Sequence, residues 1–354
     1  MKEYRVNPGK DGKLSGRLEQ VERPSPKDDQ VLIKVHVTGT NPKDWKYGHG
    51  EDGANTGDDI AGIIESTGSK VLDFKPGDRV AAFHVMGTAH GSYAEYAIAP
   101  ASTTFHIPPT LSFEDAATIP LVAFTASIGL YQDLGLPTPW SRPLDPSADF
   151  ERRNPIPLVV YGGTTAVGLT ALKFARLSGI YPIITVAGAS KGLIESANLA
   201  DTIIDYRGNK DVAGDIARAL GGRELLHAFD AFSEAPSAAP LAENLSPSGK
   251  LVGVLYYEGP LANGHTVKFA ACGNSHPGWA EVPSLRYESL FDAEFAYVFS
   301  RYLTRLLVEG KFETHPVEVL PGGLNGIAEG LNRLKEGKVK GSKLVARIAE
   351  TEGL

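Results

Sequence analysis

The sequence of 354 residues contains a single cysteine, Cys272. One thiol excludes a disulfide within the chain, and it also excludes a structural zinc site built from four thiolates. An isolated thiol is usually a small hydrophobic side chain in a protein core, so we expect Cys272 to have a packing role.

The sequence also lacks an excess of basic residues and a long apolar run. It has 35 Lys and Arg against 42 Asp and Glu, a formal net charge of -7, and no basic cluster, which argues against a nucleic-acid-binding protein. The first residues, MKEYRVNPGKDGK, contain no apolar signal region, and we expect no stretch to be long and apolar enough to span a bilayer. A cytoplasmic protein without a membrane partner is therefore expected.

The rest of the composition is ordinary for a globular enzyme. Hydrophobic residues make up 42% of the chain and charged residues 22%, and the length suggests two domains. Short alternating runs such as 31–37 and 80–83 predict a mostly β domain up to about residue 124, where Ser112 and Asp115 are typical of a helix start. A helix is expected from 116 to 134, interrupted near Pro120.

The segment from 156 to 191 has the pattern of strand, glycine-rich turn, helix and strand. Apolar runs at 158–161 and 183–187 flank Gly162, Gly163 and an amphipathic stretch that ends at Gly179. This order predicts a βαβ unit whose turn faces a dinucleotide pyrophosphate, with Gly168 allowing close packing of helix and strand. The candidate cofactor-binding residues of the turn are Gly162, Gly163, Thr164, Thr165, Ala166 and Val167.

Two alternatives stay open for this segment. Thr164, Thr165 and Ala166 stand where a third glycine is expected, so a parallel-sheet turn without a ligand has the same pattern. The second strand is followed by Ser190 and Lys191 and not by Asp or Glu, which favours the 2′-phosphate of NADPH over NADH. Ser190 is equally suited to cap the next helix.

Beyond residue 191, strands are expected at 203–206, 228–232 and 251–255, with helices between them. Alternation of this kind predicts a doubly wound parallel sheet that is covered on both faces. The Pro-rich, charged segment 136–157 is expected to be a surface loop, which either contacts a partner protein or is an idle insertion. Near the C-terminus we expect a helix at 296–308 and strands at 317–320 and 344–348.

The whole chain resembles the medium-chain dehydrogenases/reductases. The motifs that carry the resemblance are, in chain order, Asn41-Pro42-Lys43-Asp44, Pro76-Gly77-Asp78-Arg79-Val80, Gly91-Ser92-Tyr93-Ala94-Glu95-Tyr96, the turn at Gly162, Asp205-Tyr206-Arg207 and Gly341-Ser342-Lys343-Leu344-Val345. The resemblance implies an α/β fold with a GroES-like, mostly β domain at 1–124, completed by 304–354. A Rossmann domain at 125–303 would bind NADPH.

The zinc-dependent branch of that family holds a metal through Cys and His residues. The corresponding positions here are Asn41 and Asp58, which offer neither a thiolate nor an imidazole. No pair among His84, His90 and His106 has helical metal-binding spacing, so we expect no metal site. The resemblance thus points to the zinc-free quinone and enoyl reductases.

Within that branch the chain is similar to the trans-acting enoyl reductases that work beside fungal highly reducing polyketide synthases. The features are Asn41 to Lys46, Thr125-Ala126 and the insertion before Tyr161. Toxin-cluster oxidoreductases match equally well. The implied activity is NADPH-dependent, metal-independent reduction of α,β-unsaturated thioesters in secondary metabolism, with an acyl carrier domain of a synthase, or its acyl thioester, as partner. A monomer is favoured over a homodimer. A stand-alone quinone or enone oxidoreductase, and an NADPH-binding partner without turnover, remain the alternatives.

The same resemblance implies the roles of individual residues. Lys46 and Thr125 would donate hydrogen bonds to the thioester oxygen as it gains negative charge. A solvated lysine is the alternative for Lys46, and a carboxamide contact or a bond to its own helix is the alternative for Thr125. The remaining cofactor-binding candidates are Asn41, Pro42 and Asp44 below the nicotinamide, Tyr206 near the 2′-phosphate, Leu255, and Lys343 at a cofactor phosphate, where an exposed turn lysine is the alternative.

Overall fold

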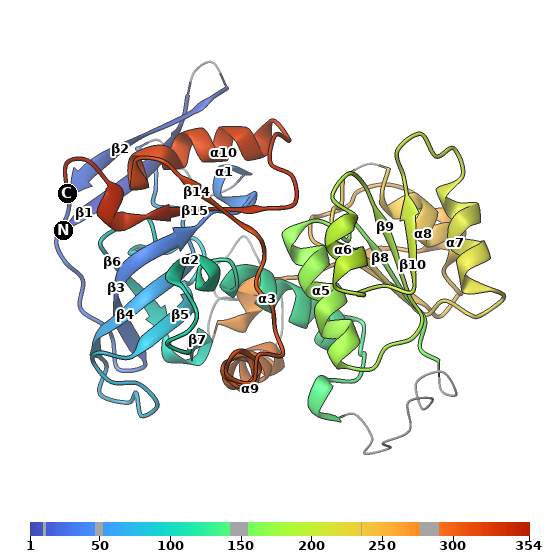
Figure 1. The fold of residues 1–354 in the computed structure, drawn as a ribbon, viewed down its shortest axis with the longest axis horizontal. Helices are drawn as coiled ribbons and strands as arrows, with labels where there is room; N and C mark the ends of the chain where they lie inside the picture. Colours follow the sequence, from blue (N-terminus) through green and yellow to red (C-terminus); the bar gives the residue numbers. More distant parts are fainter. Residues whose placement is uncertain (10–11, 47–51, 142–154, 235, 277–289) are drawn as a thin grey trace. The chain divides into compact units, whose positions relative to one another are not determined.

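The computed structural model describes residues 1–354 except 10–11, 47–51, 142–154, 235 and 277–289. The chain divides into two units, each with its own sheet (Figure 1). The first unit is Met1–Leu121 with Gly273–Leu354, and the second is Val122–Cys272. The expected α/β fold with a mostly β part and a doubly wound part is confirmed.

The first unit is built on a seven-stranded sheet and a separate antiparallel pair. The sheet order is β14, β15, β3, β4, β5 and β7, with β6 paired to β3. The strands of the unit are β1 Lys2–Pro8, β2 Leu14–Gln20, β3 Gln30–Gly39, β4 Asp59–Thr67, β5 Arg79–Phe83, β6 Tyr96–Pro100, β7 Thr104–His106, β14 Val317–Leu320 and β15 Lys343–Arg347. The C-terminal strand β15 pairs antiparallel with β3, so the end of the chain returns to the N-terminal sheet.

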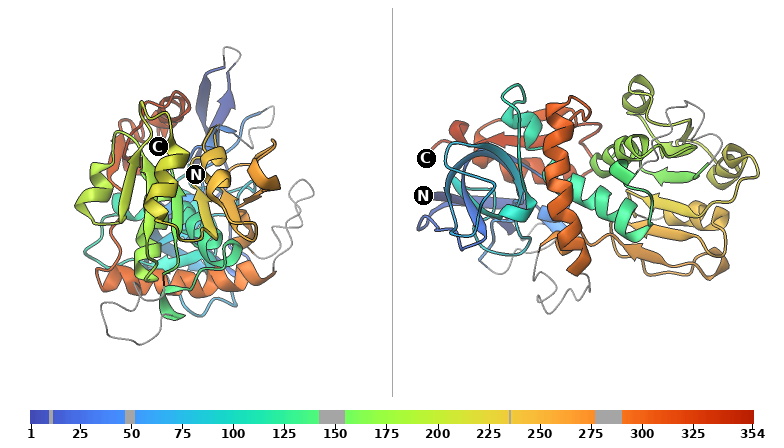
Figure 2. Two further views of the ribbon diagram at one scale, coloured as in Figure 1. Left: turned by 90° about the vertical axis from the view of Figure 1, so that its right-hand side faces the viewer. Right: turned by 90° about the horizontal axis from the view of Figure 1, so that it is seen from below.

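Strand β3 shows why the N-terminal sequence forms a sheet with a buried face. Val31, Ile33 and Val35 lie on one face and are almost fully buried, while on the other face Leu32 is buried and Lys34 is exposed, so that face is covered only in part. The helices of this unit are α1 Lys43–Lys46, α2 Phe113–Ala116, α9 Leu290–Val308 and α10 Ile327–Lys335. Helix α9 packs against β7 and the short 3-10 helix Ala101–Thr103 (Figure 2).

The second unit contains a six-stranded parallel sheet in the order β10, β9, β8, β11, β12, β13. This is the doubly wound order 3-2-1-4-5-6. Its strands are β8 Leu158–Tyr161, β9 Ile183–Ala187, β10 Thr202–Asp205, β11 His227–Asp230, β12 Lys250–Gly253 and β13 Val267–Phe269. Its helices are α3 Pro120–Ser127, which starts at the boundary, α5 Ala166–Leu177, α6 Gly192–Ser196, α7 Val212–Leu220 and α8 Ala238–Asn244.

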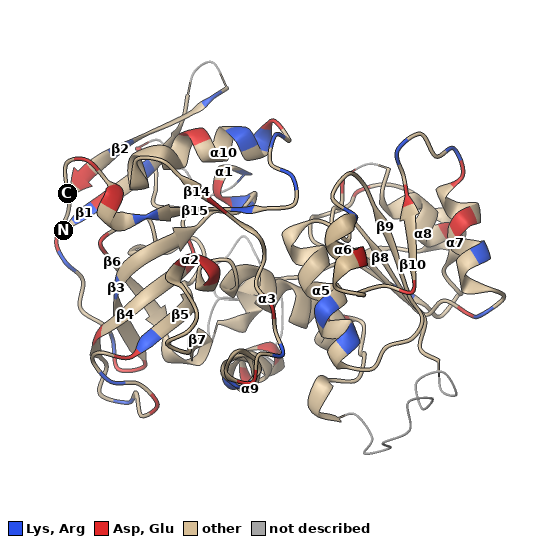
Figure 3. Cartoon of the chain, viewed as in Figure 1, with Lys and Arg blue, Asp and Glu red and all other residues tan. Residues whose placement is uncertain are grey.

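The inner strands of this sheet have the apolar character that burial on both faces demands. Strands β8 and β9 are buried at every residue and contain no charged side chain, while Lys, Arg, Asp and Glu gather on helices and loops (Figure 3). Both strands occupy the predicted residues. Strands β10, β11 and β12 begin one residue earlier than expected.

The helix expected from 116 to 134 is divided into three pieces. Ser112 caps α2 as predicted, since its Oγ accepts a hydrogen bond from the Asp115 amide at 3.0 Å. Pro120 begins α3, and a π-helix follows at Ile128–Asp133. We expected no stretch to be long and apolar enough to span a bilayer. By length and composition alone, Phe113–Asp133 is such a stretch, so this expectation is wrong. However, 83% of its apolar window is buried inside the protein.

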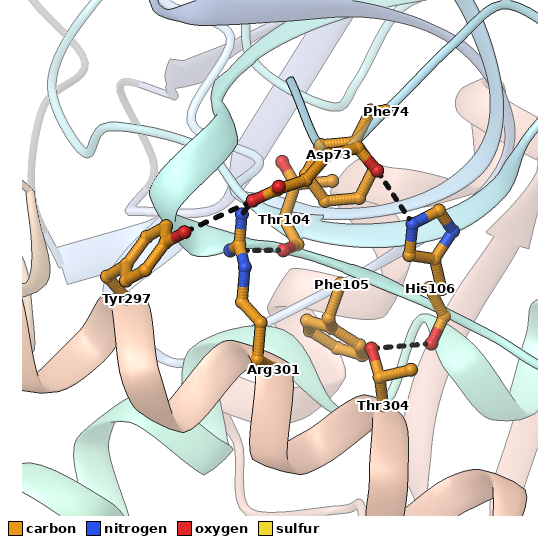
Figure 4. Close-up of a pocket in the computed structure, with 8 residues that line it drawn as sticks. All are labelled: Asp73, Phe74, Thr104, Phe105, His106, Tyr297, Arg301 and Thr304. Atoms are coloured by element: carbon orange, nitrogen blue, oxygen red, sulfur yellow. Dashed lines mark hydrogen bonds and ion pairs between the residues drawn. The ribbon is translucent and has the colours of Figure 1, made fainter. Parts of the chain in front are cut away.

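The boundary between the units near the C-terminus differs from the expected one at residue 303. Helix α9 begins at Leu290, six residues before the predicted start, and belongs wholly to the first unit. The physical reason for this boundary is that Arg301 anchors α9 to the first unit. Arg301 donates hydrogen bonds to the carbonyls of Ala101 and Thr104, and it forms an ion pair with Asp73 at 2.6 Å (Figure 4).

Candidate functional site

The glycine-rich turn between β8 and α5 is shaped by three glycines. Gly162 has φ of +79°, a conformation that favours glycine. A Cβ atom on Gly163 would lie 2.1 Å from Thr185 Oγ1, and one on Gly168 would lie 2.2 Å from the carbonyl oxygen of Gly162. The close packing predicted for Gly168 is confirmed, and any side chain at these positions would displace the turn.

Thr165 ends the turn and caps the helix that follows it. Its Oγ1 accepts a hydrogen bond from the Gly168 amide at 3.0 Å and donates one to the Ala231 carbonyl at 3.1 Å. Helix α5 therefore begins at Ala166, and its first amides have no acceptor within the helix. A glycine turn without side chains in front of such amides fits the pyrophosphate of a dinucleotide. The threonine that seemed to break the glycine pattern is thus the helix cap.

Lys191, which follows β9, lies near Asp205 and Arg207 at the end of the adjacent strand β10. This group of two cations and one carboxylate is called here the corner after β9. Arg207 holds Asp205 through two hydrogen bonds, Nη2 at 2.6 Å and Nε at 3.0 Å, and Lys191 Nζ lies 3.9 Å from the same carboxylate. The hydrogen bonds from Arg207 lower the pKa of Asp205. Tyr206 is 46% exposed, and a Cβ atom on Gly188 would lie 2.9 Å from its ring, so the tyrosine covers the glycine. Sequence reasoning named Lys191 and Tyr206 but gave Arg207 no role.

The alternative role for Ser190 is wrong. Helix α6 begins at Gly192, its N-cap residue is Lys191, and no side chain caps it. Ser190 contributes its carbonyl group instead, which accepts a hydrogen bond from the Leu193 amide at 3.0 Å. Its hydroxyl is therefore not used as a helix cap, and a phosphate contact stays a prediction.

In the first unit, four predicted or neighbouring residues join in one buried network. Asn41 Nδ2 donates to Asp59 Oδ2 at 2.7 Å, and the Asn41 amide donates to Asp44 Oδ2 at 2.7 Å. Lys343 is 4% exposed, and its ammonium lies 2.5 Å from Asp59 Oδ2 and 3.1 Å from Asn41 Oδ1. Lys343 is therefore not an exposed turn lysine. Its role at a cofactor phosphate, like those of Asn41, Pro42 and Asp44, stays a prediction.

A second network adjoins the first through Asp44. Lys43 Nζ forms ion pairs with Asp44 Oδ1 at 2.8 Å and with Asp58 Oδ2, and it donates to the Thr56 carbonyl at 2.6 Å. The other oxygen of Asp58 lies 2.7 Å from His84 Nδ1. From the sequence, Asp58 was noted only as standing at a zinc-ligand position without being a suitable ligand, and His84 only as an unsupported substitute ligand. Lys43 was quoted as part of a motif but given no role, because nothing local in the sequence indicates which distant side chains it meets.

The two predicted catalytic residues belong to different units. Lys46 ends α1 in the first unit, where it is half-buried and its Nζ lies 5.0 Å from the centre of the Trp45 ring. Thr125 lies on α3 in the second unit and is 5% exposed. Leu255 follows β12 and is half-buried. Their roles stay predictions.

The positions that carry metal ligands in the zinc branch hold different chemistry here. Asn41 and Asp58 are engaged with Asp59 and Lys43, as described above. Of the other histidines considered, His106 Nε2 lies 3.1 Å from the Asp73 carbonyl oxygen. Over the described ranges, no group of three or more His, Cys, Asp or Glu side chains is arranged to hold a metal ion.

Comparisons with known proteins place the chain in a family. Residues 27–109 match the alcohol dehydrogenase GroES-like domain. Trans-enoyl reductase fsr4 of Gibberella fujikuroi is 38% identical over 320 residues, covering 88% of this chain and 89% of that protein. Trans-enoyl reductase resD of Aspergillus sclerotiorum is 33% identical over 348 residues, covering 92% of this chain and 96% of that protein.

Solved structures of low sequence identity share the fold. An alcohol dehydrogenase superfamily protein from Novosphingobium aromaticivorans superposes with a TM-score of 0.76 at 20% identity, covering 98% of this chain and 99% of that one. The CurK enoyl reductase gives a TM-score of 0.71 at 18% identity and 98% coverage of both chains. Membership of the family implies a nicotinamide cofactor, which the turn at Gly162 fits. The chain therefore belongs to the medium-chain dehydrogenases/reductases, a family of oxidoreductase enzymes, in the zinc-free group of the trans-enoyl reductases.

Proposed function

We propose that this enzyme uses NADPH to reduce the α,β-unsaturated thioester of an acyl chain that a separate polyketide synthase carries. The observation that carries the proposal is the 38% identity with a trans-enoyl reductase over nearly the full length of both proteins. The glycine turn, the cationic corner after β9 and the buried networks around Asn41 support it with chemistry suited to this reaction.

The preference for NADPH follows from the charges at the corner after β9. Lys191 and Arg207 bring two positive charges, and Asp205 brings one negative charge that is already paired with Arg207. A 2′-phosphate adds a strong anion, which a guanidinium and an ammonium attract. No acidic residue stands between Ala187 and Lys191, where a carboxylate would repel that phosphate.

The reaction requires that the thioester oxygen be stabilised as it gains charge. Bound NADPH would supply the hydride that the β-carbon accepts, and the α-carbon would then take a proton, which gives the saturated thioester. Lys46 and Thr125 are the donors we propose for the oxygen, and a preorganised donor of this kind contributes about 3 kcal/mol to a reaction barrier where water is excluded. With these two donors, stabilisation of the thioester oxygen requires no metal ion as a Lewis acid.

Purified enzyme incubated with NADPH and one of three additions tests the proposal. The additions are a crotonyl thioester of pantetheine, a benzoquinone and buffer alone, and NADPH absorbance at 340 nm reports turnover. Consumption with the thioester, and formation of the saturated acyl product by mass spectrometry, is the expected result. Consumption with the quinone alone would make it a quinone reductase, and NADPH binding without turnover would make it a non-catalytic partner.

Trans action is tested with a carrier domain. The same crotonyl group loaded on an excised acyl carrier domain should be reduced with a lower KM than the free pantetheine thioester, because the carrier domain adds contacts of its own. Equal KM values for the two substrates would contradict a role for the carrier domain as partner.

A further inference from the structure

Lys43 is a half-buried lysine whose three ammonium protons each face an acceptor. The acceptors are Asp44 Oδ1 at 2.8 Å, the Thr56 carbonyl at 2.6 Å and Asp58 Oδ2. An ammonium group has three donors and no acceptor, so its hydrogen-bonding capacity is filled. The side chain is 18% exposed, and the two carboxylates are 0% and 2% exposed.

The two carboxylate oxygens depend on this lysine. Within the described part of the chain, neither Asp44 Oδ1 nor Asp58 Oδ2 accepts a hydrogen bond from any other donor. Burial alone would lower the pKa of Lys43, but Asp44 and Asp58 together outweigh burial and raise it. Removing the ammonium would leave two buried carboxylate oxygens without a counter-ion, which is a strongly destabilising arrangement.

Both ring nitrogens of His84 have partners. Nδ1 faces the Asp58 carboxylate at 2.7 Å. Nε2 lies 3.0 Å from the Ala89 carbonyl oxygen and 3.2 Å from Thr88 Oγ1, which itself donates to the Val85 carbonyl at 2.8 Å. These contacts join Asp58 to the segment 85–89.

The cluster brings a cation and carboxylates together with little water around them. Lys43 pairs with both Asp44 and Asp58, and burial raises the pKa of Asp44 to about 6 although Lys43 opposes that rise. The neighbouring Asp59 and Lys343 form another buried ion pair at 2.5 Å. Buried ion pairs tolerate the loss of one partner poorly, because the remaining charge has no water to screen it.

The cluster fastens α1 to the rest of the first unit. Asp44 Oδ2 accepts from the Asn41 amide at 2.7 Å and from the fully buried Tyr93 hydroxyl at 2.6 Å. Thr56 Oγ1 donates to the Asp44 carbonyl at 3.0 Å. Lys46 lies three residues after Lys43 on the same single helical turn. The orientation of α1 therefore sets the orientation of Lys46.

We propose that Lys43 is a positioning residue, which through Asp44 and Asp58 holds α1 in the orientation that directs Lys46 to the substrate oxygen. This inference rests on the proposed function. The three ammonium protons of Lys43 are already used within the cluster, so we assign it no contact with substrate or cofactor and expect its effect mainly in turnover. The expected contacts with the NADPH phosphates at the turn and at Lys191 are left unchanged when Lys43 is replaced.

The test replaces Lys43 by methionine, which matches the unbranched apolar stem of lysine up to Cε and removes the charged ammonium group. We expect Lys43→Met to lower kcat for the thioester by about tenfold or more, as misplacement of a catalytic group does, with the Kd for NADPH within about threefold of wild type. Lys70→Met removes an equal charge from an exposed ion pair with Asp28 in the same unit and should leave both values unchanged. Wild-type kcat in Lys43→Met would overturn the proposal.

The pH profile separates positioning from a general structural defect. In the wild type, burial raises the pKa of Asp44 to about 6, and the Lys43 charge opposes that rise. Without Lys43, Asp44 and Asp58 face each other, His84, Tyr93 and the Asp59–Lys343 pair, so the pKa values of both carboxyl groups should be higher than in the wild type. Carboxylates with a raised pKa are protonated and harmless at low pH, and their charge disrupts the site as pH rises. The ratio of variant to wild-type kcat should therefore increase as pH falls from 8 to 6. A ratio independent of pH would contradict the charge argument.

A double variant restores the charge balance. Lys43→Met with Asp58→Asn removes one positive and one negative charge, so the net charge of the cluster is that of the wild type, and it should recover part of kcat. If Lys43→Met does not fold, the double variant decides: lowered kcat with unchanged NADPH affinity supports the proposal, and wild-type kcat overturns it.

Hydrogen exchange of the amides at 41–46 gives a readout without substrate. Lys43→Met should exchange faster there than wild type and Lys70→Met, and equal rates would overturn the proposal. Absence of thioester turnover in the wild type would contradict the proposed function alone, and the exchange rates would then decide whether Lys43 holds α1.

Discussion

At the scale of single residues, Lys191 is the side chain on which the proposed preference for NADPH over NADH most directly depends. Its ammonium and the Arg207 guanidinium share Asp205, so a 2′-phosphate would meet two cations at this corner. We expect Lys191→Glu to raise the Kd for NADPH by about tenfold or more, because a charge-assisted contact is lost and a repulsion is added, with little effect on NADH.

Lys210→Glu is the matched control for that measurement. Lys210 is an exposed lysine of the same unit, so the substitution makes the same change in net charge. Fluorescence titration of both coenzymes gives the four dissociation constants. Equal weakening of NADPH by the two variants would show that long-range charge, and not a contact at Lys191, governs the affinity.

His276 should make the free energy of unfolding of the first unit depend on pH in the acid range. It is 2% exposed and packs on the Phe83 ring at 4.6 Å between centroids, and burial, with the nearby His84 charge, lowers its pKa to about 3. A histidine with a depressed pKa is neutral in the folded protein, so its contribution to stability is complete above pH 6.5 and is lost as pH falls towards 3.

His276→Phe removes that titration and keeps a ring beside Phe83. Between pH 6.5 and 4 the free energy of unfolding should fall less steeply in the variant, by up to about 1.4 kcal/mol per pH unit, the value for one proton. Urea unfolding at pH 7, 6 and 5 measures the slope. Parallel slopes in the two proteins would show that His276 does not take up a proton on unfolding in this range.

Residues with a role in a local turn could be predicted from the sequence, whereas residues defined by a distant partner could not. Gly162 and Gly163 were predicted because the turn needs residues without side chains between two apolar runs, which is a local requirement. The pairing of Lys43 with Asp58, and of Asp59 with Lys343, joins residues 15 and 284 positions apart. Such pairs follow from the sheet topology and leave no local pattern.

At the scale of elements, the start of α5 depends on how closely it approaches β8. A Cβ on Gly168 would meet the Gly162 carbonyl oxygen at 2.2 Å, and backbone atoms there cannot move aside without deforming the turn. We expect Gly168→Ala to lower the free energy of unfolding by about 1–3 kcal/mol, as overpacking does, and to weaken NADPH binding.

Gly192→Ala in the same unit is the control. Gly192 starts α6, and a Cβ there would have no atom within 4 Å among the described residues. Alanine should therefore be neutral or stabilising by about 0.5–1 kcal/mol. Thermal unfolding compares the two variants, and equal Tm values would contradict the steric argument at Gly168.

Helix α9 is held to the first unit by Arg301, which lines a cavity of about 200 Å³ with Tyr297, Phe74 and His106 (Figure 4). Arg301 donates to the Ala101 and Thr104 carbonyls, pairs with Asp73 and lies 4.2 Å from the Tyr297 ring centre. Arg301→Met should lower the free energy of unfolding by about 1–3 kcal/mol, the cost of leaving partly buried acceptors without a donor.

Arg305→Met, one turn later on α9, provides the comparison. Arg305 pairs with Glu309 at the surface, and its side chain is 66% exposed, so its loss should change stability by no more than about 0.5 kcal/mol. Denaturant unfolding of the first unit measures both. A larger effect at Arg305 than at Arg301 would contradict the anchoring role.

Elements with strong periodic or apolar patterns were predicted, and those defined by pairing were not. Strands β8 and β9 were placed at their observed residues because each is a short apolar run between turn residues. Strand β14 was placed correctly from the valines that alternate with Glu318. Strand β13 has three residues and was not predicted, since Val267–Phe269 is too short to show a pattern. The early start of α9 at Leu290 was missed because its first turn contains Asp292.

At the scale of the whole molecule, the outer edge of the six-stranded sheet bears on whether the enzyme is a monomer. Strand β13 lies at that edge and, in the described ranges, pairs with β12 alone. It is short, and its central residue, Lys268, is exposed and pairs with Asp133 at 2.5 Å. Short edge strands with an outward lysine resist pairing with a second sheet.

We therefore expect a monomer near 37.7 kDa in sedimentation velocity at micromolar concentration. Lys268→Val would remove the charge and raise the β-propensity of the edge, next to the stacked rings of Tyr256 and Phe269 at 4.4 Å. This variant should show a concentration-dependent dimer, whereas Lys210→Val, which removes a lysine away from the edge, should not. A wild-type dimer that Lys268→Glu fails to dissociate would mean that the subunits associate through another surface.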